Sequence, residues 1–407
     1  MVAMTTQLSW RARGAIGALR ATNALSRRLG RGAGTVAGGR VGLTLDPDLV
    51  AHLSRGREVI LVTGTNGKTT TSAMVRAGWG GDVAANTTGA NMPEGHAAAL
   101  ATSRASRVVL ETDEAWLARA VADTTPTVVV LLNLSRDQLD RATEVRALAQ
   151  RWRECLAVPG GTMVVVANAA DPLVVYAAEV ATDVRWVDVP STWHGDAASC
   201  PKCTRALTFT ASSWWCSCGF APPAHPRAHV DRRVTIGGEP YDVELALPGQ
   251  FNRVNATFAA LALEVVGVEL AAAFSRIATL SSVQGRYGDR RFGSHRVRLL
   301  LAKNPAGTAA LWEALEASDE VWMAINAHVA DGKDPSWLYD VPCEALRGRR
   351  VMCLGERRLD LATRLTYEDI DAIVVDEPAT LTTGDAPVTL IANYTAFREW
   401  MQRTERW

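Results

Sequence analysis

Val62-Thr-Gly-Thr-Asn-Gly-Lys-Thr-Thr70 links a short β-branched run, Glu58 to Thr63, to a segment with the pattern of a helix. Glycines let the backbone turn tightly and point its N–H groups at phosphate oxygens, and the helix start adds a positive dipole end. Lys68 can reach the terminal phosphates of a nucleotide, and the Thr69 hydroxyl can bind Mg²⁺. Only the short pattern G-x-x-G-K-T is present, but its place between a strand and a helix predicts nucleotide binding. The residues expected to bind are Gly64, Thr65, Asn66, Gly67, Lys68, Thr69 and Thr70.

Buried β-branched runs alternate with helical stretches along most of the chain. In the first half, strands are expected at 58–63, 108–110, 128–132 and 163–166. In the last third, strands are expected at 296–301, 321–325, 351–354, 372–375 and 388–391. Such alternation predicts parallel sheets with crossover helices. We therefore expect an α/β protein with an N-terminal helical segment (1–40), a P-loop central domain (41–290) and a C-terminal Rossmann-like α/β domain (291–407).

The composition suits a soluble globular enzyme of two or three domains. Hydrophobic residues make up 48% of the 407 and charged residues 21%, which argues against a disordered chain. Lys plus Arg and Asp plus Glu each number 43, so a general nucleic-acid or membrane-surface binder is disfavoured. The sequence has no run of 18 apolar residues, so no membrane span is expected. No apolar stretch of the kind found in a secretory signal follows the Arg-rich start. We expect that start to be a solvated surface helix.

Four of the seven cysteines cluster as Cys-x-x-Cys, twelve residues, then Cys-x-Cys. Two close pairs of thiolates suit tetrahedral Zn²⁺, and four protein ligands leave no open position, so the metal would be structural. A disulfide scaffold would be shorter and denser in cysteine, so the pattern favours a cytosolic protein. We expect a zinc ribbon inserted at about 195–222, with Trp214, Trp215 and Phe220 packed around it. The expected ligands are Cys200, Cys203, Cys216 and Cys218.

An acidic segment follows the strand expected at 108–110. A carboxylate there lies at the carboxyl edge of the sheet, where ligands bind in open α/β folds. Because Mg²⁺ prefers hard oxygen ligands, we expect Glu111 to bind it together with Thr69. A solvated acidic turn is the alternative.

Several motifs in one order resemble the Mur ligase family. The loop 64–70 is similar to that family's G-T-N-G-K-T-T, and Glu111 is similar to its strand-end metal glutamate. The segment Asn133–Asp140 resembles its N-x-x-x-D-H-L-D motif, with Gln138 where the histidine usually stands. The resemblance covers roughly 40–400 and implies a Mur ligase-like fold with ATP and Mg²⁺.

Two more segments extend the resemblance. Gly249-Gln-Phe-Asn-Arg-Val-Asn255 resembles the family's G-x-F-N-x-x-N helix start, and Gly285-Arg286 resembles the arginine segment that closes the central domain. By this resemblance Asn252, Asn255 and Arg286 would bind the base, ribose or phosphates of ATP. Asn304 is placed at the cleft in the last domain.

The cysteine cluster and the segment Asp331–Asp340 narrow the resemblance to the MurT-type subunits of lipid II isoglutaminyl synthase. Such a subunit pairs with a glutaminase, and the complex amidates the D-glutamate α-carboxyl of the lipid II stem peptide. The resemblance implies amidation through an acyl phosphate, with ammonia from a GatD-like glutaminase in a heterodimer. It also implies a cytoplasmic protein that meets lipid II at the inner face of the cell membrane.

Two residues depart from ordinary Mur ligases and folylpolyglutamate synthetases. Those enzymes use a carbamylated lysine to hold a second Mg²⁺, yet Lys202, inside the cysteine cluster, is the only lysine between 69 and 302. Gln138 replaces a second metal-site histidine. We therefore assign no second Mg²⁺ from the sequence.

The ammonia source is expected in another chain. The three scattered cysteines, Cys155, Cys343 and Cys353, lack the setting of an activated nucleophile and are interpreted as packed thiols. By the resemblance, an aspartate of this chain completes the partner's Cys–His pair. The candidates, which the sequence does not separate, are Asp331, Asp334 and Asp340.

Two alternatives belong to other classes of protein. One is a self-sufficient Mur-type or folylpolyglutamate-type amino-acid ligase, against which the missing lysine counts. The other is a zinc-ribbon NTPase that binds nucleic acid. The neutral pI and the lack of a dense basic patch around the ribbon disfavour it, so no nucleic-acid partner is expected.

Overall fold

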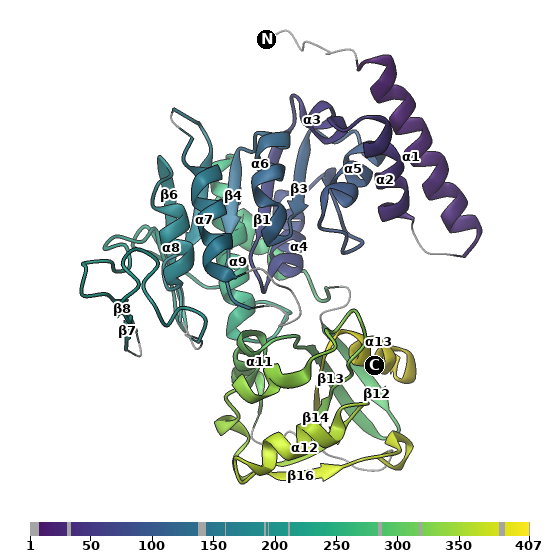
Figure 1. Ribbon diagram of the computed structural model, residues 1–407, viewed down its shortest axis with the longest axis vertical. Coiled ribbons are helices and arrows are strands. Elements are labelled where there is room, and N and C mark those ends of the chain that lie inside the picture. Colours follow the sequence, from purple (N-terminus) through teal and green to yellow (C-terminus); the bar gives the residue numbers. More distant parts are fainter. Residues whose placement is uncertain are drawn as a thin grey trace.

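The computed structural model describes residues 8–406, except 31–33, 137–143, 159, 191–192, 194, 211, 284–286, 317–319 and 382–386. Two α/β units follow one another along the chain, with the C-terminal unit at the bottom of Figure 1. Each is built on its own largely parallel sheet. The predicted α/β class is therefore confirmed.

Three helices precede the first strand: α1 (Trp10–Arg28), α2 (Thr35–Leu45) and α3 (Leu49–Ser54). Helix α2 contains three glycines, Gly38, Gly39 and Gly42. Its glycines allow close packing: a Cβ at Gly38 would lie 2.0 Å from Asn23 Oδ1 of α1, and one at Gly39 would lie 2.0 Å from the carbonyl oxygen of Glu94. Helix α2 is therefore held between α1 and α5 (Pro93–Thr102).

Nine strands form the central sheet, in the order β11-β10-β9-β6-β5-β4-β1-β3-β2. In this order, all neighbouring strands between β2 and β9 pair parallel. The strands β9, β10 and β11 pair antiparallel. Their bounds are β1 (Glu58–Thr63), β2 (Val83–Ala85), β3 (Arg107–Glu111), β4 (Val128–Leu131), β5 (Val164–Asn168), β6 (Asp183–Asp188), β9 (Ala228–Val230), β10 (Val234–Ile236) and β11 (Glu239–Tyr241).

Helices cover both faces of this sheet, so both faces of β1 are buried. Val59 and Leu61 point into one core, whereas Ile60 and Val62 point into the other. The first core contains α5, α6 (Leu117–Thr124), α7 (Val145–Leu156) and α8 (Pro172–Ala178). The second contains α4 (Lys68–Trp79), α9 (Gln250–Val265) and α10 (Leu270–Ala278).

The cysteine-rich insertion leaves the central sheet after β6 and returns at β9. Its short antiparallel strands are β7 (Thr208–Phe209) and β8 (Trp214–Trp215). It projects from the central domain on the side away from α1, at the left of Figure 1.

The second sheet has the order β16-β15-β14-β17-β13-β12-β18. The five strands from β16 to β13 are parallel, whereas β12 is antiparallel to both neighbours. The charged segment before residue 291 was not expected to be a strand, yet β12 pairs with β13 over six residues. The strands are β12 (Tyr287–Phe292), β13 (His295–Leu301), β14 (Glu320–Ala324), β15 (Arg350–Leu354), β16 (Asp371–Val374), β17 (Val388–Ala392) and β18 (Glu405–Arg406).

Helices α11 (Pro305–Leu311), α12 (Arg358–Thr366) and α13 (Tyr394–Arg403) complete the C-terminal unit. Short 3₁₀ helices are η1 (Glu114–Trp116), η2 (Trp312–Ala314), η3 (Pro335–Asp340), η4 (Glu344–Leu346) and η5 (Pro378–Leu381). In the described part of the chain, no helix combines the length and apolarity needed to cross a bilayer.

Candidate active site

The phosphate loop, residues 64–70, turns from β1 into α4 at the carboxyl edge of the central sheet. Two of its glycines adopt positive φ, 139° at Gly64 and 89° at Gly67. A Cβ at Gly64 would lie 2.8 Å from the Cβ of Leu132, and one at Gly67 would lie 2.7 Å from Asn255 Oδ1. Both the backbone conformation and the close neighbours therefore require glycine here.

Asn133, which follows β4, holds the loop from the neighbouring strand. Its Oδ1 accepts from the backbone N–H of Asn66 at 2.8 Å, and its Nδ2 donates to the Asn66 carbonyl at 3.0 Å. The N–H of Thr65 donates to the Asn133 carbonyl, and its hydroxyl donates to the Ser135 carbonyl. The loop is thus fixed by the protein itself, which is the preorganisation that a phosphate site needs.

Lys68 is buried, and its ammonium group lies against a carboxylate. Nζ donates to Glu114 Oε2 at 2.8 Å and to the carbonyl of Gly64 at 2.5 Å. The two side chains are only 6% and 10% exposed, so each charge depends on the other for compensation. The sequence did not single out Glu114. It lies three residues beyond Glu111, in η1 at the end of β3, and that spacing is the only local signal.

The loop faces a cleft between the two α/β units. The cavity has a volume of about 280 Å³ and is lined by residues 65–70 of the loop, the start of α9, and residues 300–303, 306–307 and 310–311 of the C-terminal unit. Asn304, at the N-cap of α11, closes part of it: Asn66 Nδ2 donates to Asn304 Oδ1 at 3.1 Å, and Asn304 Nδ2 donates back to Asn66 Oδ1 at 3.2 Å. This reciprocal amide pair joins the two units at the phosphate loop.

Two of the three residues expected beyond the loop to bind ATP lie in this cleft. Asn252 and Asn255, in the first turns of α9, both line it. Asn252 Nδ2 donates to the carbonyl of Pro248 at 2.6 Å. Arg286 and residues 137–140 of the segment 133–140, including Gln138, lie outside the described residues.

Glu111 ends β3 beside the phosphate loop, since the register pairs it with Val62 of β1. Its backbone is fixed by Asn86, whose side-chain amide donates to the Glu111 carbonyl and accepts from its N–H. His96 Nε2 also meets that carbonyl at 2.9 Å. Burial lowers the pKa of His96, so a neutral imidazole donates this bond. The carboxylate is therefore set on a rigid strand end, beside the strand that leads into α4, and Thr69 lies in the first turn of that helix.

Asp171 is a cleft residue that sequence reasoning missed. It caps α8, accepting from the N–H groups of Leu173 and Val174, and it also accepts from Leu134 N–H at 2.7 Å. Burial raises its pKa to about 6 although these bonds oppose the shift. A short Asp-Pro helix start was the only sequence signal.

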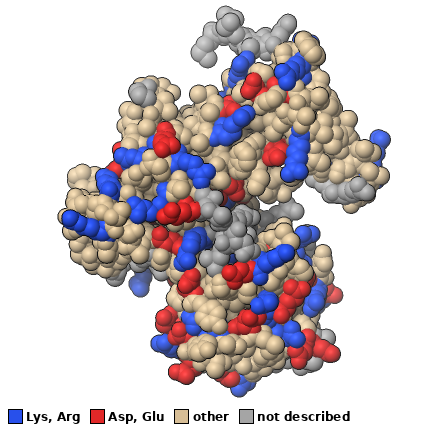
Figure 2. All heavy atoms as spheres, viewed as in Figure 1, with Lys and Arg blue, Asp and Glu red and all other residues tan. Residues whose placement is uncertain are grey.

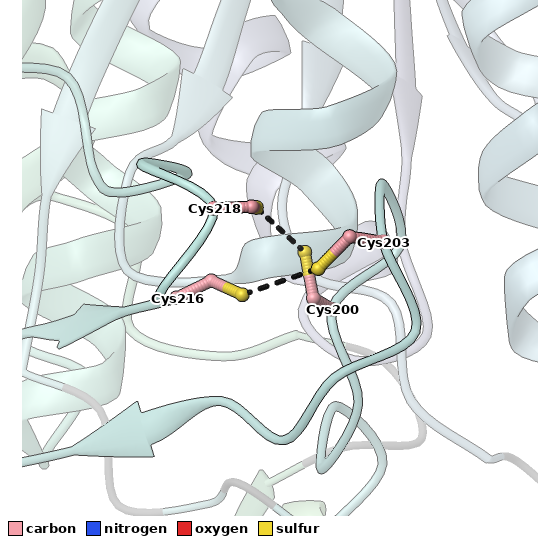
Figure 3. Close-up of side chains that lie close together, drawn as sticks. All are labelled: Cys200, Cys203, Cys216 and Cys218. Atoms are coloured by element: carbon pink, nitrogen blue, oxygen red, sulfur yellow. Dashed lines mark hydrogen bonds between the residues drawn. The ribbon is translucent and has the colours of Figure 1, made fainter.

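The four clustered cysteines face one another, as Figure 3 shows. All four sulfur atoms lie within 4.8 Å of one another, with 3.7 Å between Cys200 and Cys218 and 3.4 Å between Cys203 and Cys216. These distances exclude disulfides, which need about 2.05 Å. A tetrahedral ion with Zn–S bonds of about 2.3 Å holds its ligands roughly 3.8 Å apart. The donor set thus fits Zn²⁺.

Aromatic side chains tie the insertion to the central domain. Trp214 is 2% exposed, stacks on Phe220 with ring centroids 4.9 Å apart, and donates from Nε1 to the Ala169 carbonyl. Lys202 lies 4.6 Å above the Phe220 ring. Trp215 was expected to pack here as well, but its side chain is 44% exposed. Successive strand residues point to opposite faces, so only one tryptophan of the pair can face the cluster.

The scattered cysteines are packed thiols. Burial raises the pKa of Cys343 to about 11 and the pKa of both Cys155 and Cys353 to about 12. A thiol with such a pKa has almost no thiolate at neutral pH and is a poor nucleophile.

The three candidate aspartates differ in burial. Asp331 is 3% exposed and accepts from the N–H and hydroxyl of Thr395, so it does not fit an exposed, partner-facing role. Asp334 caps η3 by accepting from Ser336 N–H, a bond that lowers its pKa. Asp340 is 42% exposed and pairs with Arg136 of the central domain at 3.2 Å through Oδ2.

Family models match both α/β units. Residues 62–263 match the Mur ligase middle domain, and residues 301–397 match the MurT ligase C-terminal domain. The chain belongs to the Mur ligase family. It is 27% identical, over 94% of this chain and 95% of the relative, to the MurT subunit of lipid II isoglutaminyl synthase (glutamine-hydrolyzing) from Staphylococcus aureus strain COL. The MurT subunit from Streptococcus pneumoniae is 26% identical over 89% of this chain and 88% of its own. The predicted MurT-type resemblance and the enzyme class, an ATP-dependent carbon–nitrogen ligase subunit, are confirmed.

Solved structures of Mur ligases share the fold. A pseudomurein peptide ligase type C from Methanothermus fervidus superimposes with a TM-score of 0.69 at 18% identity, covering 88% of this chain and 80% of its own. MurF ligase from Thermotoga maritima, solved in complex with ADP, gives a TM-score of 0.62 at 14% identity, covering 89% and 83%. These likenesses support the α/β architecture of the Mur ligase family.

Proposed function

We propose that this chain is the ATP-dependent subunit that amidates the D-glutamate α-carboxyl of the lipid II stem peptide, using ammonia from a separate glutaminase. The observation that carries the proposal is the similarity to MurT subunits over nearly the whole chain. The geometry of the cleft supports it, because a preorganised phosphate loop faces a second α/β unit across a space open to a second substrate.

A carboxylate does not react with ammonia unaided, because its leaving group would be oxide. Transfer of the terminal phosphoryl group of ATP to the carboxylate forms an acyl phosphate and releases ADP. Ammonia then adds to the acyl carbon, and phosphate leaves with formation of the amide. In this scheme Lys68 and the loop N–H groups compensate the charge that develops on the phosphoryl oxygens.

Lys68 must change partners for this to happen. At rest its ammonium is bound by Glu114 and two loop carbonyls. A bound nucleotide brings phosphate oxygens to the loop. The Lys68 ammonium can then donate to these oxygens, while Glu114 keeps the lysine side chain close to the loop. Asn252 and Asn255 lie in the cleft where ribose or base would be bound.

Two metals are part of the proposal. Thr69 and Glu111 would hold Mg²⁺, whose chemistry is to neutralise charge on the phosphate oxygens. Cys200, Cys203, Cys216 and Cys218 would hold a structural Zn²⁺, which fits the mutual approach of their sulfur atoms. Glu111 is buried at the end of β3, beside the loop.

The partner would be a GatD-like glutaminase in a heterodimer, since Cys343 and Cys353 are buried, Cys155 is part-buried, and burial raises the pKa of all three thiols. Of the three aspartates, Asp340 best meets the requirement for a carboxylate that orients a partner's histidine. It is exposed, and its ion pair with Arg136 uses only Oδ2. Asp334 is the second choice, because its carboxylate also caps η3.

Reconstitution with a glutaminase subunit tests the proposal. We expect the complex to amidate lipid II with glutamine or with ammonium, and the isolated chain to use only ammonium. Asp340→Asn should abolish the glutamine-driven reaction while sparing the ammonium-driven one, because a neutral amide no longer stabilises an imidazolium. Asp334→Asn and Asp331→Asn are the matched comparisons.

Other outcomes would contradict parts of the proposal. Amidation by no nitrogen source would reject the ligase function. Addition of an amino acid rather than ammonia would favour a self-sufficient Mur-type ligase. If all three aspartate variants keep full glutamine-driven activity, the shared Cys–His–Asp arrangement is wrong for this chain. The site of action would be cytoplasmic, at the inner face of the membrane that carries lipid II.

A further inference from the structure

The formal neutrality of the chain conceals a strongly basic N-terminal segment. The first 45 residues hold seven arginines and no lysine, aspartate or glutamate. Because the whole chain is neutral, the remainder has a net charge of −7. The neutral net charge of the whole chain therefore does not disfavour surface binding by this segment, which we call the α1–α2 segment (residues 10–45).

Helix α1 separates its residues into distinct faces. Ala12, Ala15, Leu19 and Asn23 are buried against the rest of the central domain. Arg13, Arg20 and Arg27 recur every seven residues and are exposed, so they form one stripe along the helix. No arginine of α1 takes part in an ion pair among the described residues. Those that are anchored, such as Arg20 on the carbonyl of Ala101, use neutral acceptors.

Exposed apolar side chains accompany these arginines. Trp10 is 84% exposed, and Leu25 and Leu29 of the α1 C-terminus are 58% and 59% exposed. On α2, Val36 and Leu45 are 45% and 46% exposed. With Val41, these are six of the sixteen large exposed hydrophobic residues in the described chain, within 36 residues. Such a concentration marks an interaction surface rather than scattered surface residues.

This segment forms one outer edge of the central domain (Figure 1), where basic atoms are set in uncharged surface (Figure 2). We propose that it is a docking surface for an anionic lipid bilayer. Its apolar side chains would enter the headgroup region while its arginines contact lipid phosphates, the arrangement of interfacial amphipathic helices. The proposal deepens the proposed function, because a lipid-linked substrate requires the enzyme to work at such a surface.

The chemistry of the segment favours a bilayer over a nucleic acid. The phosphate backbones of nucleic acids are bound by basic and polar side chains. Binding to such a backbone would not explain the exposed tryptophan and leucines at the ends of α1. A bilayer uses both kinds of side chain at once. The absence of acidic residues also suits a surface that carries negative charge over its whole area.

Vesicle binding by the full chain tests this inference without lipid II or ATP, so its failure is separate from failure of the ligase function. Vesicles of phosphatidylglycerol mixed with phosphatidylcholine should sediment the protein at low salt, and pure phosphatidylcholine vesicles should not. Arg27→Gln/Arg28→Gln should weaken binding roughly 25-fold, since each basic residue near an anionic surface contributes about fivefold. Leu25→Ser/Leu29→Ser should weaken it at least tenfold.

The matched control is Arg232→Gln/Arg233→Gln, which removes the same charge from the exposed turn between β9 and β10, toward the other edge of the sheet. All these positions are exposed, so unchanged thermal unfolding is expected. Equal weakening by the control, equal binding to neutral vesicles, or no binding by the unaltered chain would each overturn the proposal. Binding to duplex DNA in place of vesicles would show that the surface serves a nucleic acid instead.

Discussion

The phosphate loop and the cysteine cluster are both proposed sites for a charged ligand, but their side chains are held in different ways. In the loop, the N–H and C=O groups of Asn66 are bonded to Asn133, and Lys68 is paired with Glu114. In the cluster, the side-chain partners of Cys200 and Cys203 are the sulfur atoms of Cys218 and Cys216, and backbone N–H groups of residues 202–205 lie beside them. The loop has its structure without the ligand, whereas the proposed metal would add the contacts that join the two cysteine pairs of the insertion.

This difference separates catalysis from folding. A site that is complete before binding has little stability to lose when its ligand leaves, so loss of the nucleotide should stop the reaction without unfolding the loop. A site whose donors meet only at a metal should lose local structure when the metal is removed. The following predictions test this contrast, starting with the largest effect.

Lys68→Ala should lower kcat/KM for amidation at least a thousandfold, about 4 kcal/mol of barrier. It should also destabilise the fold by about 3–5 kcal/mol, because Glu114 is left as an unpaired buried charge. Lys68→Ala/Glu114→Gln should recover most of the stability and none of the activity. Steady-state kinetics and chemical unfolding measure the two effects. Activity within tenfold of the unaltered enzyme would remove the loop from the reaction.

Removal of zinc should lower the stability of the protein while leaving the ATP site in place. Chelation, or Cys200→Ser, should melt the insertion and lower the unfolding temperature of the central domain, while ATP still binds to the loop. Elemental analysis should find one zinc per chain. Cys353→Ser, at a buried thiol outside the cluster, is the control and should leave the zinc content unchanged. Metal-free protein with full stability would contradict a structural role for the cluster.

Asn304→Ala should weaken the closed cleft by about 2 kcal/mol, because it leaves the Asn66 amide without its reciprocal partner. We expect a rise in the KM for ATP of roughly tenfold or more. Asn304 also caps α11 by accepting from Gly307 N–H at 2.7 Å. Asn304→Ser keeps a capping oxygen but does not reach Asn66. It should match the alanine variant in kinetics and exceed it in stability.

The smallest expected effect is the pH dependence that Asp171 gives to stability. Its pKa in the folded protein is about 6, above the ordinary aspartate pKa of 3.8. Its contribution is therefore fully present below about pH 4 and is lost as pH rises through 6, by about 1 kcal/mol between pH 5 and 7. Asp171→Asn retains an oxygen for the N–H groups of Leu173 and Val174, loses the acceptor for Leu134 N–H, and should remove this pH-dependent component. An unchanged pH profile would show that the carboxyl is ionised throughout.

What the sequence predicted well was local. The loop 64–70, the strand end at Glu111 and the paired cysteines are each defined within a few residues, where turn geometry and ligand spacing act directly. The same holds for the strands of both sheets, whose β-branched runs are buried on two faces. In the C-terminal unit, β12 was not predicted because its charged residues do not give the β-branched pattern of a buried strand.

What the sequence did not reveal depends on contacts between distant segments. Asn304 was placed at the cleft, but its bond to Asn66 joins positions 238 residues apart. Glu114 meets Lys68 only because β1 and β3 are neighbours in the sheet. The burial of Asp331 likewise follows from Thr395, on another helix. No spacing along the chain encodes these pairings.

The two bridges across the cleft differ in chemical character. The amide pair of Asn66 and Asn304 carries no charge, whereas Arg136 and Asp340 form an exposed ion pair. Dissolved salt screens exposed charges but has little effect on neutral amides. Rising ionic strength should therefore weaken the contact between Arg136 and Asp340, while the hydrogen bonds between Asn66 and Asn304 persist. Of these two contacts between the units, one depends on the salt concentration and the other does not.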